Sequence, residues 1–303
     1  GRSTVACGAE EEDTPQRRLY HIYSDWFGGA RDAATDALVG SKEYSAKYSD
    51  YMLAAARMAA DEKDWFSAEV LYDGLVKQGC THITCEAARV CLNGGKIDKA
   101  LSLYRDAEAS DPHSPMVMEG LTDVYTKMGR RDDAAQCMLD FLDTERADLD
   151  AYLICAERLV SGSMNAHAEP VVRKILMNYP ENTKANILKS KNDAVKGDYP
   201  GALDAATAAV KSDPKDPDAR LQRAKVLFSM SRSEKAMKEA QAALKLSPSD
   251  TSIMVLIKDI YAAQGNNRAS LEMCERILKL DPENADIMLD SSEVMMAMGD
   301  TEG

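Results

Sequence analysis

The sequence lacks the features that mark membrane, metal and nucleic-acid proteins. No apolar run reaches the about 20 residues that span a bilayer. There is no CxxC pair, HExxH, GxSxG or phosphate-cradling Gly-rich loop. The formal net charge is −13, and no basic stripe is present to attract nucleic acid or an anionic membrane. We therefore expect no nucleic-acid partner, no membrane insertion, no metal and no cofactor.

Aromatic residues and paired cysteines are also scarce. Aromatics make up 6% of the chain, while Ala is abundant, which suits close helix packing. The seven cysteines are odd in number and irregularly spaced. This pattern is typical of reduced, buried thiols, so we expect a cytoplasmic protein in a reducing compartment. His82, Cys85 and Cys91 come nearest to a ligand cluster, but a helical register scatters them, which argues against zinc.

What the chain does contain is a fixed period. A proline recurs every 34 residues at Pro180, Pro214, Pro248 and Pro282; Pro112 lies on the same grid, and Arg146 takes the place of the missing proline. A period of this length that ends in Pro indicates a helix–turn–helix repeat. The best examples are Tyr125-Gly129-Ala134, Gly197-Ala202-Pro214 and Tyr261-Gly265-Pro282.

The spacing inside one period explains the helix pair. Apolar residues at repeat positions 4, 7, 8 and 11 place one stripe on the first helix. A Gly near position 15 supplies the positive φ of the turn. A small residue near position 20 lets the second helix approach closely, and Pro at position 32 ends it. One such pair cannot bury its own apolar face, so the pairs must stack.

This pattern resembles that of the tetratricopeptide repeat family. The resemblance implies an all-α fold, a right-handed superhelical solenoid of antiparallel helix pairs. It covers residues 49–303, which divide into 49–80, 81–114, 115–148, 149–182, 183–216, 217–250, 251–284 and a partial repeat 285–303. Residues 1–14 are predicted to form an acidic flexible arm, and residues 15–48 a degenerate capping helix pair.

The resemblance also implies a concave groove lined by the first helix of each pair. Positions 5 and 6 hold an apolar row across four repeats, and position 9 carries charged residues. We predict that partner proteins bind here through Leu153, Ile154, Glu157, Ile187, Leu188, Lys191, Leu221, Lys225, Val255, Leu256 and Asp259. The alternative is that the apolar row packs against the neighbouring first helix. Replacing Leu188 and Leu256 by Glu is expected to abolish binding while helicity is kept.

The predicted ligand is a peptide or amphipathic helix with Leu, Ile or Phe anchors and Lys or Arg flanks. The basic flanks are expected because acidic residues rim the groove, namely Asp150, Glu157, Asp218, Asp259, Asp286 and Glu293. Acidic chaperone tails are disfavoured. Family members that bind them carry Lys at position 5 and Asn at position 9, and no repeat here has that pair, as in Cys85/Arg89 and Glu119/Asp123.

A second predicted interface lies at the C-terminal end, on Met288, Met295 and Met298. The chain starts at Gly1 and stops partway through a repeat at Gly303, so we expect it to belong to a longer protein. The predicted function is a non-enzymatic scaffold that holds partner proteins within a multi-subunit assembly. The alternative is a regulatory or targeting domain of a larger enzyme whose catalytic part lies outside this sequence.

Overall fold

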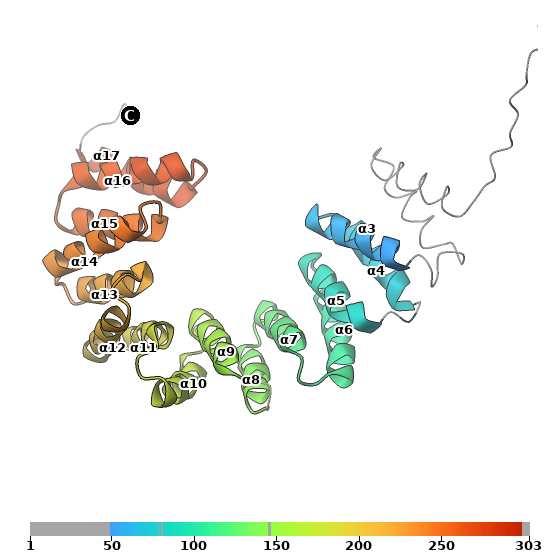
Figure 1. Ribbon diagram of the computed structural model, residues 1–303. Coiled ribbons are helices and arrows are strands. Elements are labelled where there is room, and N and C mark those ends of the chain that lie inside the picture. The colour runs from blue at the N-terminus through green and yellow to red at the C-terminus, as the bar shows by residue number, and fades with distance from the viewer. Residues whose placement is uncertain (1–48, 78, 80, 145–146, 299–303) are drawn as a thin grey trace, which may run out of the picture. The chain divides into compact units, whose positions relative to one another are not determined.

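The computed structural model describes residues 49–77, 79, 81–144 and 147–298. The arm and the capping pair predicted for residues 1–14 and 15–48 lie outside these ranges. Over the described residues, fifteen α-helices follow one another in antiparallel pairs, with no strand among them (Figure 1). The all-α prediction is therefore confirmed. The chain divides into two compact units, Gly1–Thr144 and Glu145–Gly303.

Three helix pairs make up the described part of the first unit. They are α3 Ser49–Asp61 with α4 Trp65–Lys77, α5 Thr84–Asn93 with α6 Ile97–Ser110, and α7 Pro115–Lys127 with α8 Arg131–Leu142. A short 3-10 turn, Thr81–Ile83, leads into α5.

The second unit contains four pairs and a ninth helix. They are α9 Leu149–Ser161 with α10 Asn165–Asn178, α11 Thr183–Val195 with α12 Tyr199–Ser212, α13 Pro217–Ser229 with α14 Ser233–Leu246, α15 Thr251–Ala263 with α16 Asn267–Leu280, and α17 Ala285–Met298. The second helices end just before the periodic proline, as at Ser212 before Asp213-Pro214. Pro200 lies in the first turn of α12, where its missing N–H has no helical partner to lose.

The turn inside each pair depends on one residue in the left-handed region. Gly129 and Gly265 have φ of 73°, and Gly95 and Gly197 have φ of 81°. Ser163 and Ser231 take the equivalent place with φ of 59°. In the turn between α9 and α10, the left-handed residue is Ser163 and not the preceding Gly162, which has a φ of −76°.

The odd-numbered helices of the second unit begin with a recurring side-chain cap. The last residue of the preceding interval accepts a hydrogen bond from the backbone N–H three residues on, as Asp148 does from Ala151 at 2.9 Å. The caps are Asp148, Asn182, Asp216, Asp250 and Asn284. Each satisfies an N–H that the first turn leaves without a helical partner, which is worth about 1 kcal/mol.

Small residues let the two helices of a pair approach each other. The residue at position 20 is fully buried in six successive intervals, as Ala100, Ala134, Ala168, Ala202, Ala236 and Ser270. Larger side chains such as Met138, Leu159 and Ile277 fill the space around them. Within each unit, a pair therefore shares its core with the next pair, as the stacking argument requires.

A buried ion cluster ties α4 to α6 in the first unit. Glu69 is 8% exposed and accepts from Lys96 Nζ at 2.6 Å and from Lys99 Nζ at 2.8 Å. Lys99 also binds Asp73 at 2.6 Å. Burial raises the pKa of Glu69, but the hydrogen bonds from the two lysines outweigh it and hold that pKa below its ordinary value.

Glu69→Gln is expected to lower the free energy of unfolding of the first unit by about 2 kcal/mol at pH 7, because it removes the carboxylate that Lys96 and Lys99 share and leaves Lys99 only Asp73. A lowered folded-state pKa means that the contribution is complete above the unfolded value of about 4.3 and is lost as the pH falls through the folded value. The difference between Glu69→Gln and wild type should therefore shrink in acid. Urea unfolding at pH 7 and pH 4 measures it.

The matched control is Asp106→Asn, which removes an exposed carboxylate from α6. Its cost is expected to stay within about 0.5 kcal/mol at both pH values. Equal unfolding profiles for the two variants would contradict a stabilising role for the cluster.

Candidate functional site

The predicted groove residues of the second unit lie on helices that contact one another. Contacts join α9 to α11, α11 to α13 and α13 to α15, whereas successive even-numbered helices make fewer. The odd-numbered helices therefore line one side of this unit's stack, and the even-numbered helices the other (Figure 1). We call the first side the inner face. Positions 5 and 9 of each repeat belong to it.

The apolar row on this face is largely buried. Leu188 is 2% exposed, and Leu153, Ile187, Leu221 and Leu256 are similarly buried. Val255 is half-buried, and Ile154 is exposed at 39%. The burial fits packing between neighbouring odd-numbered helices, the alternative left open by the sequence. The accessible part of the inner face is consequently made mainly of polar side chains.

The position-9 residues form the exposed charged row of the inner face. Glu157, Lys191 and Lys225 are exposed, and Asp259 is half-buried. Glu157 pairs with Lys184 of the next odd-numbered helix at 2.7 Å. Asp259 pairs with its neighbour Lys258 at 3.0 Å, and Lys258 also pairs with Asp290. Among the described residues, Lys191 and Lys225 have no ion-pair partner.

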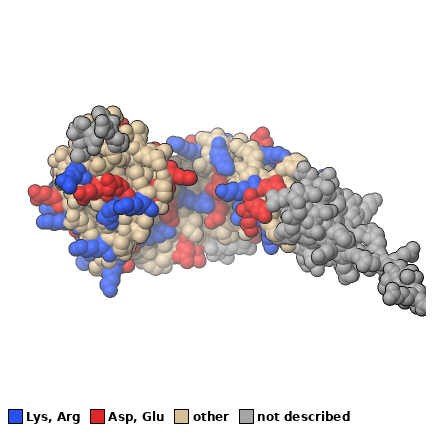
Figure 2. Space-filling model, turned by 90° about the horizontal axis from the view of Figure 1, so that it is seen from above, with Lys and Arg blue, Asp and Glu red and all other residues tan. Residues whose placement is uncertain are grey.

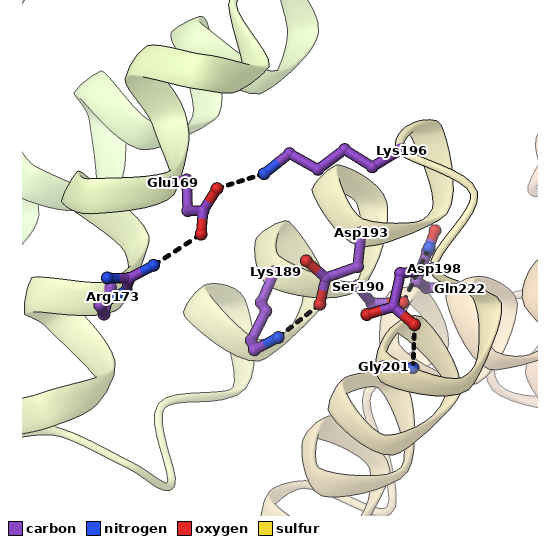
Figure 3. Close-up of polar contacts among 9 residues, drawn as sticks. All are labelled: Glu169, Arg173, Lys189, Ser190, Asp193, Lys196, Asp198, Gly201 and Gln222. Carbon is purple, nitrogen blue, oxygen red and sulfur yellow. Dashed lines mark hydrogen bonds and ion pairs between the residues drawn. The ribbon is translucent and has the colours of Figure 1, made fainter.

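A buried polar link sets α11 against α13 beneath these lysines. Gln222 Nε2 donates to Ser190 Oγ at 3.0 Å, and both side chains are buried (Figure 3). Ser190 directly precedes Lys191, and Gln222 lies about one turn before Lys225. The link therefore brings the two lysine-bearing stretches to the same level of the stack. Burial and the nearby charge of Lys191 lower the pKa of Lys225.

A pocket that the sequence did not reveal lies between α10 and α11. Its volume is about 290 Å³, with Val172 and Leu176 on one wall and Met177 at the rim. The opposite wall carries an ion pair between Lys189 and Asp193 (Figure 3). Lys189 and Asp193 occupy repeat positions 7 and 11, where most repeats have apolar or aromatic residues. The charged pair at these positions was therefore the one sequence feature that could have indicated the pocket.

Polar contacts rim this pocket. Glu169 accepts from Arg173 at 2.6 Å and also binds Lys196 at the end of α11 (Figure 3). These hydrogen bonds lower the pKa of Glu169, with the bond from Lys196 contributing most. Pockets of about 390 Å³ and 420 Å³ occupy equivalent places beside α7 and α15. The pocket is therefore a recurring product of repeat packing.

The first unit has its own inner-face pocket of about 420 Å³. It is lined by the position-5 and position-9 residues of two repeats, Cys85, Arg89, Glu119 and Asp123. The structure thus brings together residues that the repeat spacing placed on one face. Opposite charges mix here, and the face drawn in Figure 2 likewise shows basic and acidic side chains interspersed over the described residues.

The predicted end interface lies on α17. Met288 is exposed at 47%, and Met295 is half-buried. The side chain of Met298 lies outside the part of the chain that the structure describes. Leu289 and Met296 of the same helix are also exposed. An interface on this helix stays a prediction.

We next consider metal-binding groups, reactive thiols and membrane-spanning helices among the described residues. Among them, no group of three or more His, Cys, Asp or Glu side chains could hold a metal ion. The thiols of Cys85, Cys91, Cys137 and Cys274 are free. Burial raises the pKa of Cys137 to about 11, so its nucleophilic thiolate is scarce at neutral pH. A search of the described helices for a segment long and apolar enough to cross a bilayer finds none.

Comparison with known families agrees with this architecture. Two family models described as tetratricopeptide repeat match residues 117–152 and 192–251. The chain contains tetratricopeptide repeats. Tetratricopeptide repeats generally mediate protein–protein interactions and are typically non-catalytic. No curated protein sequence matches the chain.

Several solved structures share the fold. A repeat protein from Parabacteroides merdae is 17% identical with a TM-score of 0.61, over 82% of this chain and 98% of that one. PilW, a type IV pilus biogenesis factor, is 18% identical with a TM-score of 0.53, over 70% and 98%. A repeat protein from Thermus thermophilus is 19% identical with a TM-score of 0.50, over 58% and 96%. At these identities the likeness concerns the fold alone.

Proposed function

We propose that this tetratricopeptide repeat protein is a non-enzymatic scaffold that binds peptide or helical segments of partner proteins on the inner face of its second unit, as part of a multi-subunit assembly. The observation that carries the proposal is the row at position 9. It presents Lys191 and Lys225 to solvent, on adjacent helices and with no ion-pair partner among the described residues. Charged side chains left unpaired on one face are available to a second protein.

The structure refines the proposed ligand contacts. Because most of the apolar row is buried, Ile154 and Val255 are its accessible members. Glu157 and Asp259 remain at the two sides of the central lysines, although each already has a lysine partner. The buried thiols of Cys91, Cys155 and Cys274 support the proposed cytoplasmic, reducing setting.

Site-specific photocrosslinking tests the proposed face. Benzoylphenylalanine placed at Lys191 or Lys225 is expected to crosslink a discrete set of proteins in the native cells, because a bound segment lies within reach of both positions. The matched controls place the same group at Lys211 of α12 and Lys238 of α14, which are exposed lysines of the even-numbered helices. Crosslinks of equal number and identity from all four positions would contradict the proposal, as would no crosslinks from the inner face.

A further inference from the structure

The central lysines of the inner face differ from Glu157 and Asp259, the two charges that flank them in their row and that each form an ion pair. Lys191 and Lys225 occupy the same repeat position on neighbouring helices, and both are exposed. Packed helices lie about 9 Å apart, so two flexible lysine stems can reach one group between them. The Ser190–Gln222 hydrogen bond fixes the level at which the two helices meet. The two lysines thus form a cationic centre that can contact one ligand group from two adjacent helices.

The acidic residues on this face do not neutralise that centre. Glu157 is engaged by Lys184, and Asp259 and Asp290 by Lys258. Asp218 lies about two turns from Lys225 on the same helix, and Asp250 caps α15 through the N–H groups of Ser252 and Ile253. Both raise the pKa of Lys225, yet burial and Lys191 prevail and lower it. Because no described acidic side chain forms an ion pair with Lys191 or Lys225, both ammonium groups stay available between α11 and α13.

The order of charge along the inner face is consequently negative, positive, negative. Asp150 and Glu157 lie on α9, Lys191 lies on α11, Lys225 lies on α13 about two turns after Asp218, and Asp259, Asp286 and Glu293 follow on α15 and α17. A ligand that runs across the odd-numbered helices meets these charges in that order. Complementary charge selects partners mainly by excluding the wrong ones.

We propose that Lys191 and Lys225 together bind the side-chain carboxylate of an internal Asp or Glu in the partner segment, with basic residues on both sides of it. The inference rests on the proposed function and specifies the ligand of that same face. It adds an acidic centre to the basic flanks that the sequence predicted. We favour an internal side chain over a C-terminal carboxylate because a basic flank on each side requires that the segment continue in both directions.

Selection from random peptides tests the inference without a known partner. A display library of 16-residue peptides, fused at both ends so that no terminal carboxylate is free, is selected on the immobilised full chain. Wild type is expected to enrich Asp or Glu at one place between basic residues. Lys191→Glu/Lys225→Glu is expected to lose that preference and to enrich Lys or Arg there. The matched control, Lys211→Glu/Lys238→Glu, makes the same change in net charge on the other side and should select as wild type does.

A synthetic peptide with the enriched sequence then measures how much the central carboxylate contributes to binding affinity. Replacing its central acidic residue by the matching amide is expected to weaken binding to wild type at least about tenfold, because a charge-assisted hydrogen bond is lost. The same replacement should change binding to Lys191→Ala/Lys225→Ala less than about twofold. Circular dichroism of both double variants should match wild type, since the exchanged side chains are exposed.

The outcomes separate the inference from the function beneath it. Peptides that bind the inner face without an acidic preference, or with one unchanged in Lys191→Glu/Lys225→Glu, would overturn the inference and leave the scaffold function standing. Selection of free-carboxylate peptides alone, from a second library with open C-termini, would also overturn it. If neither library yields peptides whose binding depends on the inner face, the proposed function fails together with the inference.

Discussion

Leu188→Glu is expected to unfold the second unit, lowering its free energy of unfolding by at least about 4 kcal/mol. Leu188 is 2% exposed on α11, in the middle of the stack, so the new carboxylate would lose its water without gaining a partner. Removing the leucine from a packed site alone costs about 3–5 kcal/mol, and the buried charge adds to this. Urea unfolding followed by circular dichroism at 222 nm is the measurement.

Ile154→Glu is the matched control for this prediction. It makes the same exchange of a branched aliphatic side chain for a carboxylate on the same face, at a residue that is 39% exposed. Its cost is expected to be about 1 kcal/mol, because the charge stays in water. Similar unfolding midpoints for the two variants would show that Leu188 is not the packed residue described here. The paired Leu188 and Leu256 substitution expected from the sequence to spare helicity is therefore unsuited to testing binding.

Gly120→Ala is expected to destabilise the first unit by about 2 kcal/mol or more. Helix propensity alone predicts the opposite sign, because Ala in a helix interior is favoured over Gly by about 1 kcal/mol. A Cβ on Gly120 of α7 would lie 2.1 Å from Cε1 and 2.2 Å from Cζ of Tyr104. Tyr104 is 3% exposed on α6, so its ring has little room to withdraw. The clash therefore outweighs the gain in propensity.

A double-mutant cycle with Tyr104→Ala separates the two effects. Tyr104→Ala alone is expected to cost about 3–5 kcal/mol, because it leaves a cavity over α7. In that background the ring is gone, so Gly120→Ala should become neutral or stabilising, with a coupling energy of about 2 kcal/mol or more. Stabilisation by Gly120→Ala in the wild-type background would refute the close approach of Tyr104.

The fold could be predicted because its determinants are local and repeated. The 34-residue spacing of prolines and turn glycines locates the ends of helices such as α12 and α16. Each signal acts within one helix pair, through φ or through a missing N–H, so it can be recognised without knowing what packs against it. The caps at Asp148 and Asn182 are equally local and could have been recognised from Asp or Asn at position 34.

The surface was harder to predict because burial depends on how successive pairs meet. Ile154 and Leu188 occupy the same repeat position, yet one is exposed and the other buried. The repeat position predicts on which face of its helix a residue lies. How closely the neighbouring helix packs against that face decides whether the side chain is exposed to water. Lys189 shows the same limit, since its i,i+4 pairing with Asp193 can be predicted from the sequence but only the structure places the pair at the wall of a pocket.

The caps of the second unit also affect how it can be divided. Each odd-numbered helix from α9 to α17 donates a backbone N–H of its first turn to the side chain of the last residue of the preceding interval. That residue is Asn182 for α11 and Asp250 for α15. A 34-residue segment that includes the N-cap of its own first helix therefore begins one residue before the repeat defined by its helices. A duplication or deletion of 34 residues keeps every helix start intact, whichever residue it begins at, because the replacement cap arrives with the neighbour.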